Sequence, residues 1–125
     1  MPTPEQVRAA VDAYVDAYNR DDRQRFLDAF AADGVIVDPV GTPAHVGVEA
    51  RGAFWDGVHQ LSETLTLDVH HVHVAGDGAA MVFTVLARTG EAGVAMDAVD
   101  VFRVADDGSI AELAAYWDMT KARQI

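Results

Sequence analysis

Hydrophobic and polar residues alternate along the second half of the chain, which is the pattern of β-strands with one buried face. The alternation predicts four strands, over about residues 64–74, 79–88, 94–104 and 109–119. The short connections between them are rich in Gly and Asp, which suit the tight turns of β-hairpins. Consecutive hairpins generate an antiparallel meander, so we expect these strands to form one antiparallel sheet.

The first half of the chain has helical spacing instead. Thr3 and Gln6 predict a capping box at the start of a first helix, and Pro4 suits its first turn. Apolar residues then recur every three or four positions from Val7 to Tyr18. We therefore expect an amphipathic helix that packs on the sheet through this stripe.

Two further helices are expected before the strands. The second covers about residues 22–32 and is ended by Gly34, and a short strand over residues 35–38 stops at Pro39. The third covers about residues 48–61. Helices first and hairpins after favour an α+β fold, in which three helices pack on a curved, mainly antiparallel sheet and close a cone-shaped cavity.

The composition agrees with one folded domain over residues 1–125, since half of the residues are hydrophobic. The formal net charge of −11 argues against nucleic acid and anionic membranes as partners. No apolar run has the length of a membrane span, and the N-terminus lacks the pattern of a signal peptide, so we expect a cytoplasmic protein. The lack of cysteine excludes disulfides and thiolate chemistry.

Asp100 is conspicuous because it falls on the apolar face of the strand predicted over residues 94–104, whereas Asp97 and Arg103 fall on the other face. A lone buried carboxylate is costly, so such a group stays protonated, pairs with a partner or takes part in chemistry. A neutral acid in an apolar site can donate a hydrogen bond to a developing oxyanion. The alternative is a structural Asp that accepts hydrogen bonds from loop amides.

Two more polar groups are placed against apolar neighbours. Tyr14 lies on the stripe of the first helix, so its hydroxyl needs a partner inside the protein. Asp38 ends the short strand on the same side as Ile36, just before Pro39. Each also has an ordinary interpretation, as a core tyrosine with a satisfied hydroxyl and as a turn-forming Asp.

Several segments of the chain, taken in order, match a known family. They are Thr3-Pro4-Glu5, Tyr14-Val15 and Asn19 in the first helix, Leu27-Asp28-Ala29-Phe30-Ala31-Ala32-Asp33 in the second, Val37-Asp38-Pro39-Val40-Gly41 after it, and Val99-Asp100-Val101-Phe102-Arg103 in a strand. In this order they resemble the Δ5-3-ketosteroid isomerase family, which shares the cone-shaped fold of nuclear transport factor 2. The resemblance covers nearly the whole chain.

The resemblance implies an enzyme that moves the double bond of a 3-oxo-Δ5-steroid, or of a similar small hydrophobic ketone, to the Δ4 position through a dienolate. Asp38 would be the base that removes a proton and returns it two carbons along. Tyr14 and a neutral Asp100 would donate hydrogen bonds to the dienolate oxygen. The resemblance implies no cofactor and no metal, and it implies a homodimer that pairs through its sheets.

Aromatic residues are candidates for binding a flat ring system. We expect Phe54, Trp55, Phe102 and Trp117 to bind substrate, with Phe102 on the same strand face as Asp100. Trp55 departs from the family pattern, which commonly has a tyrosine there to support the oxyanion-hole tyrosine. Trp has one N–H and no acceptor oxygen, so the network around Tyr14 is expected to be shortened or rebuilt with other groups.

The histidines do not form a recognisable metal site. His71 and His73 have the spacing that places both imidazoles on one face of a strand, with His70 expected on the other, and no third ligand is identifiable. Two other functions remain open. One is a polyketide cyclase or dehydratase of the same fold, for which the sequence shows no suitable His–Asp pair. The other is a non-catalytic module that binds hydrophobic ligands.

Overall fold

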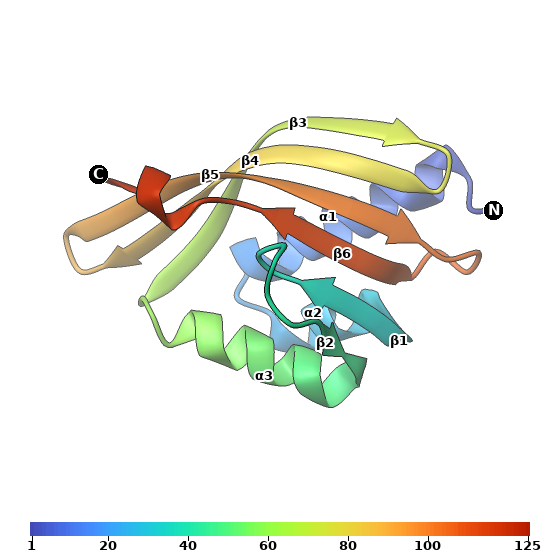
Figure 1. The fold of residues 1–125 in the computed structure, drawn as a ribbon, viewed down its shortest axis with the longest axis horizontal. Helices are drawn as coiled ribbons and strands as arrows, with labels where there is room; N and C mark the ends of the chain where they lie inside the picture. The colour runs from blue at the N-terminus through green and yellow to red at the C-terminus, as the bar shows by residue number, and fades with distance from the viewer.

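The computed structural model describes all 125 residues as three α-helices packed against one curved, seven-stranded sheet (Figure 1). The helices are α1 (Pro4–Asn19), α2 (Arg23–Asp28) and α3 (Gly47–His59). The strands are β1 (Phe30–Val37), β2 (His45–Val46), β3 (Thr64–Ala75), β4 (Gly78–Thr89), β5 (Ala92–Val104), β6 (Ile110–Tyr116) and β7 (Arg123–Gln124). Their order in the sheet is β2-β1-β6-β5-β4-β3, and β7 pairs with β5. The predicted α+β class with helices on a curved, mostly antiparallel sheet is confirmed.

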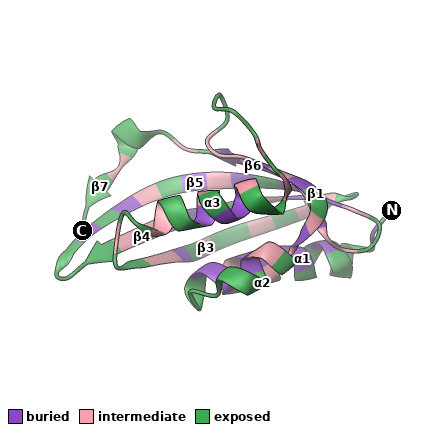
Figure 2. Ribbon diagram, turned by 90° about the horizontal axis from the view of Figure 1, so that it is seen from below, coloured by how far each residue is buried: buried purple, intermediate pink, exposed green.

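The start of α1 follows the prediction in detail. The Thr3 side chain accepts a hydrogen bond from the Gln6 backbone N–H, and the Gln6 side chain accepts one from the Thr3 N–H. The helix buries the stripe that includes Val7, Val11 and Tyr14. Figure 2 shows that buried and exposed residues also alternate along α3.

The second helix was predicted too long, because a strand begins inside the expected range. α2 ends at Asp28, and β1 already begins at Phe30. The N–H of Ile110 donates to the Ala29 carbonyl at 2.9 Å, and Phe30 is the register partner of Ile110. This parallel pairing of β1 with β6 overrides a helix-favouring local sequence. Gly34 therefore lies within a strand and does not end a helix.

The four-stranded meander is confirmed with small changes of length. Antiparallel pairs join β3 to β4, β4 to β5 and β5 to β6. The strand predicted over residues 109–119 ends at Tyr116, because Met119–Lys121 form a short 3₁₀ turn capped by the Asp118 side chain. No helix combines the length and the apolar character needed to cross a membrane.

The third helix is confirmed, but it ends earlier than expected and buries a charged residue. Leu61, the last residue of the expected range, lies beyond the end of α3 and is 80% exposed. Arg51 is buried instead, and its guanidinium donates to the Gly34 carbonyl at 2.7 Å and lies over the Phe30 ring. α3 thus holds β1 through a buried cation bonded to backbone carbonyls.

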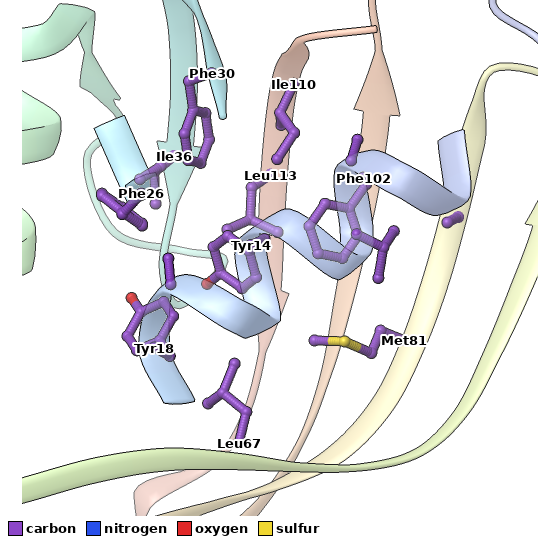
Figure 3. Packing of buried hydrophobic residues seen from close by; sticks show 14 of the residues in the cluster. Tyr14, Tyr18, Phe26, Phe30, Ile36, Leu67, Met81, Phe102, Ile110 and Leu113 are labelled. Carbon is purple, nitrogen blue, oxygen red and sulfur yellow. The ribbon is translucent and has the colours of Figure 1, made fainter. Parts of the chain in front are cut away.

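The core lies between α1, α2 and the concave face of the sheet, where aromatic rings contact one another (Figure 3). One polar contact connects this layer to β3. The Asn19 side chain at the end of α1 accepts from the Leu67 N–H at 2.7 Å and donates to the Leu67 carbonyl at 3.1 Å. Two hydrogen bonds from one amide fix the distance between the helix and the strand.

We predict that Asn19→Ala lowers the free energy of unfolding by about 1–2 kcal/mol, because it leaves the Leu67 N–H and carbonyl without this partner. Urea unfolding followed by circular dichroism measures the change. Arg8→Ala is the control, since it removes an exposed ion pair with Asp12 from the same helix and should cost under about 0.5 kcal/mol. Equal losses in the two variants would contradict the role given to Asn19.

Candidate active site

A cavity of about 360 Å³ opens between α1, α3 and the concave side of β3, β4 and β5. Of its 20 lining residues, 17 are hydrophobic, and the other three are Asp38, Ser62 and Asp100. The size and the apolar lining suit a small hydrophobic ligand, with a few polar groups to orient it. Asp38 and Asp100 are the only charged-type side chains on the wall, and no basic residue lines it.

Asp100 enters this cavity from the middle of β5, so the expected inward orientation is confirmed. Its side chain is 2% exposed, and its neighbours on the same face, Ala98 and Phe102, are buried as well. Burial raises the pKa of Asp100 well above the ordinary value, and the negative charge of Asp38 raises it further. The nearby Tyr14 hydroxyl lowers the pKa of Asp100 but is the smallest of the three effects. The surroundings of Asp100 therefore favour its neutral, protonated form.

Tyr14 and Tyr18 occupy successive turns of α1 and both line the cavity. Their ring centroids are 5.2 Å apart, and Figure 3 shows the two rings side by side on the helix. Burial raises the pKa of the Tyr14 hydroxyl well above its ordinary value, and the neighbouring Tyr18, Asp100 and Asp38 raise it further. Burial also raises the pKa of Tyr18, and the neighbouring Tyr14 hydroxyl opposes this shift. Both phenols therefore keep their protons and can act as hydrogen-bond donors.

Asp38 follows the last residue of β1 and reaches the cavity next to Ile36. The indole Nε1–H of Trp117 donates to its Oδ1 at 2.5 Å. Burial raises the pKa of Asp38, whereas the Trp117 hydrogen bond and the positive charge of His45 lower it. The carboxylate form of Asp38 thus has stabilising partners that Asp100 lacks, and the Asp38 charge itself disfavours ionisation of Asp100. The two carboxyl groups are placed in environments that separate their pKa values.

The four aromatic residues expected to bind substrate occupy two different positions. Phe54 and Trp117 line the cavity. Trp55 and Phe102 lie behind its wall, where they are 3% and 1% exposed. Phe102 packs edge-on against the Tyr14 ring at 5.3 Å, and Trp55 packs against the Tyr18 ring at 4.7 Å. These two support the tyrosines, so any effect on a bound ligand passes through Tyr14 and Tyr18.

Sequence reasoning missed Tyr18 as a polar group of the site and treated it as part of an apolar stripe. Its position four residues after Tyr14 was the available signal, because residues at this spacing share one helix face. It also missed Met119 and Ala122, which line the cavity from the segment that follows β6. Their spacing carries no regular pattern.

The histidines of β3 lie outside this site, on the opposite face of the sheet. The His71 and His73 rings are 4.1 Å apart, as their spacing predicted. The expectation that His70 faces the other way is wrong, because a bulge between Val69 and His71 turns its ring toward the Thr84 hydroxyl, 2.7 Å away. No group of three or more His, Cys, Asp or Glu side chains has an arrangement that suits a metal ion.

Comparison with solved structures supports the fold. The epoxide hydrolase/cyclase-like enzyme SalBIII, studied for pyran ring formation in the polyether salinomycin, superposes with a TM-score of 0.87 at 23% identity, covering 98% of each chain. RV0760c from Mycobacterium tuberculosis gives a TM-score of 0.87 at 23% identity, covering 100% of this chain and 98% of its own. A computationally designed 17-OHP binder gives a TM-score of 0.84 at 22% identity, covering 100% of this chain and 98% of its own.

Comparison with protein sequences identifies the family. The Steroid Delta-isomerase of Nocardioides simplex is 26% identical over 112 residues, which cover 90% of this chain and 89% of that protein. The model of the SnoaL-like domain matches residues 11–113, which include Tyr14, Asp38 and Asp100. The chain therefore belongs to the SnoaL-like domain family, whose fold is that of nuclear transport factor 2.

Proposed function

We propose that the protein is a cofactor-independent steroid Δ-isomerase, which moves the double bond of a 3-oxo-Δ5-steroid or a similar unsaturated ketone into conjugation. The observation that carries this proposal is the meeting of Asp38, Tyr14 and Asp100 in one apolar cavity, with the two carboxyl groups in different electrostatic environments. One can ionise and accept a proton while the other stays neutral and donates a hydrogen bond.

Asp38 is the base in this proposal. Its carboxylate takes the proton from the carbon between the carbonyl group and the double bond, and the electron pair of that C–H bond moves into a dienolate. The same carboxyl group then returns the proton two carbons along the conjugated system, so no external acid or base is consumed. The Trp117 N–H, bonded to one carboxylate oxygen, leaves the other oxygen free for the proton.

Tyr14 and Asp100 stabilise the dienolate in this proposal. Negative charge moves onto the ketone oxygen as the proton leaves, and two pre-positioned donors in a cavity with an apolar wall stabilise that charge. Burial keeps the Tyr14 phenol protonated through its raised pKa, so its donor is available before the substrate binds. The cavity has no cation to attract an anionic ligand, which favours a neutral ketone.

The relatives support a hydrophobic ligand of this kind. The sequence relative from Nocardioides simplex is a Steroid Delta-isomerase. RV0760c has been solved in complex with estradiol-17β-hemisuccinate, and the designed relative binds 17-OHP. The enzyme SalBIII supports the alternative of a ring-forming cyclase, and the nearness of His45 to Asp38 supplies a His–Asp pair that the sequence did not reveal. Steroid binding without turnover would favour a binding module.

We predict that the purified protein converts 5-androstene-3,17-dione to the conjugated 4-ene-3-ketone without added metal or nucleotide. Asp38→Asn should lower kcat by about 10²–10⁴-fold, because it removes the base, while binding of a phenolic dienolate mimic is retained. Absorbance of the conjugated ketone measures turnover. Asp68→Asn, an exposed carboxylate on β3, is the matched control and should keep full activity. Wild-type turnover no faster than the buffer-catalysed rate would refute the proposal.

A second prediction concerns the pH dependence of stability caused by Asp100. Because its pKa is raised in the folded protein, folding retains a proton that the unfolded chain releases near pH 3.9. This contribution to the free energy of unfolding is fully present below pH 3.9 and is lost as pH rises through the folded pKa. Its size is about 1.4 kcal/mol for each pH unit that separates the folded pKa of Asp100 from the unfolded one. Asp100→Asn cannot ionise, so its free energy of unfolding should fall less steeply with pH than that of wild type.

Denaturant unfolding between pH 4 and 8 measures this difference in slope, and turnover of Asp100→Asn and Asp100→Leu completes the test. Asn keeps a hydrogen-bond donor and should retain more activity than Leu. Parallel stability curves for wild type and Asp100→Asn, with equal activity in the Asn and Leu variants, would show that Asp100 is not a neutral hydrogen-bond donor.

We also propose that the protein is a homodimer that pairs through the outer face of its sheet. Apolar residues gather there in two neighbouring rows across β4, β5 and β6, and several are well exposed. The rows are Val82, Val99 and Tyr116, and Ala80, Val101 and Ala114. Charged pairs border them, Asp97 with Arg123 on one side and Arg103 with Glu112 on the other. An apolar centre with a charged border is the usual composition of a stable interface.

The prediction from this surface is that Val101→Asp gives a monomer, because Val101 is 42% exposed at the centre of the patch and a buried charge there has no partner. Light scattering coupled to size-exclusion chromatography measures the mass. Val48→Asp on α3 is the control, since Val48 is 56% exposed outside the patch and its variant gains the same charge. A wild-type monomer at all concentrations would rule out the dimer.

A further inference from the structure

His45 is the only charged-type residue near Asp38 that the isomerase proposal leaves without a role. It lies on β2, which pairs antiparallel with the end of β1, and its register partner is Ile36. Ile36 is fully buried, and Asp38 follows it by two residues, directly after the last residue of β1. His45 is therefore the diagonal cross-strand neighbour of Asp38, a position about 7–8 Å away in an antiparallel pair.

The surroundings of His45 connect it to the cavity and to water. Its ring is half-buried and lies 5.1 Å from the ring of Phe54, which lines the same cavity as Asp38. The loop between Asp38 and His45 carries no charged residue, and its tip from Val40 to Ala44 is exposed. The imidazole is thus partly open to solvent and packs beside the cavity wall, with no charged residue in the loop that joins it to Asp38.

The other ionisable groups around this pair are accounted for. Two elements pack against β2, namely β1 and α3, and their acidic residues Asp33 and Glu49 are exposed. The other charged-type residues of α3 have partners of their own. Arg51 is bonded to the Gly34 carbonyl, Asp56 pairs with Arg23, and His59 bonds to the Trp55 carbonyl. Asp38 itself faces Asp100 from β5 and the phenols Tyr14 and Tyr18 from α1. Each of these three groups is neutral or anionic, so His45 is the one cation that acts on Asp38.

We propose that His45 acts on the reaction through Asp38, as a cationic neighbour that favours the ionised form of this base. The inference rests on the proposed role of Asp38 as the base. The positive charge of a protonated imidazole favours the carboxylate form of a neighbouring acid. His45 is then a positioning residue, which need not touch the substrate. The lowering of the Asp38 pKa by the His45 charge agrees with this arrangement.

Trp117 gives a direct readout of this coupling that does not depend on turnover. Its indole N–H donates to Asp38, so its resonance in a ¹H–¹⁵N NMR spectrum changes as Asp38 gains a proton. The chain has two tryptophans, and the resonance that no longer titrates in Asp38→Asn is that of Trp117. The midpoint of this titration measures the ionisation of Asp38 in the folded protein.

We predict that His45→Gln raises this midpoint by about half a pH unit, as expected for one unit charge at about 7 Å in a largely aqueous environment. His45→Lys keeps a cation and should restore the wild-type midpoint. The difference between wild type and His45→Gln should shrink as salt is added. His71→Gln, which removes an exposed histidine from the outer face, is the matched control and should leave the midpoint unchanged.

The acidic side of the pH profile of kcat should move by the same amount in His45→Gln, with kcat at pH 8 nearly unchanged. Equal midpoints in wild type and His45→Gln, or failure of His45→Lys to restore the midpoint, would overturn the inference even if the protein is an isomerase. If the midpoint moves as expected but wild type has no turnover, the coupling of His45 to Asp38 stands and the proposed function fails.

Discussion

The parallel pairing of β1 with β6 is the constraint on which the site depends. β1 comes from the helical half of the chain and β6 from the meander, and the pairing reaches from Phe30 opposite Ile110 to Val37 opposite Ala114. The Val40 N–H extends it by donating to the Ala115 carbonyl at 2.8 Å. Since Ala115 is also the register partner of Asp100, this one contact brings the end of β1, and Asp38 with it, beside Asp100. Arg51 on α3 secures β1 from the other side through the Gly34 carbonyl.

Two carboxyl groups brought together in an apolar cavity cannot ionise equally. The difference between them comes from their partners, because both are desolvated. Asp38 has the Trp117 N–H and the His45 charge, whereas Asp100 has a single phenol and faces the Asp38 charge. The asymmetry is therefore a property of the fold, and it exists before any ligand enters. A site prepared in this way can divide proton transfer and charge stabilisation between two residues of the same type.

Local sequence patterns were enough to predict the parts of the structure that local interactions determine. The capping box of α1, the hairpins and the inward orientation of Asp100 all follow from spacing within a few residues. The extent of β1 could not be predicted this way, because residues 30–34 prefer a helix and become a strand only by pairing with β6. The bond from Trp117 to Asp38 spans 79 positions, and the approach of His45 depends on the register of a two-residue strand. The bulge that redirects His70 has no local signature either.

Trp55 shows how a change in one element is compensated by another. The resemblance to ketosteroid isomerases implies a tyrosine hydroxyl at this position of the third helix, and an indole cannot accept a hydrogen bond from Tyr14. In this chain the hydroxyl beside Tyr14 belongs to Tyr18, one turn further along α1. The Trp55 indole lies against the Tyr18 ring at 4.7 Å, and His59 stacks on the Trp55 ring at 3.9 Å. The Trp55 side chain therefore restricts the movement of the Tyr18 ring. The two phenols of the site thus lie on one helix, α1, and α3 contributes to their placement through the packing of Trp55.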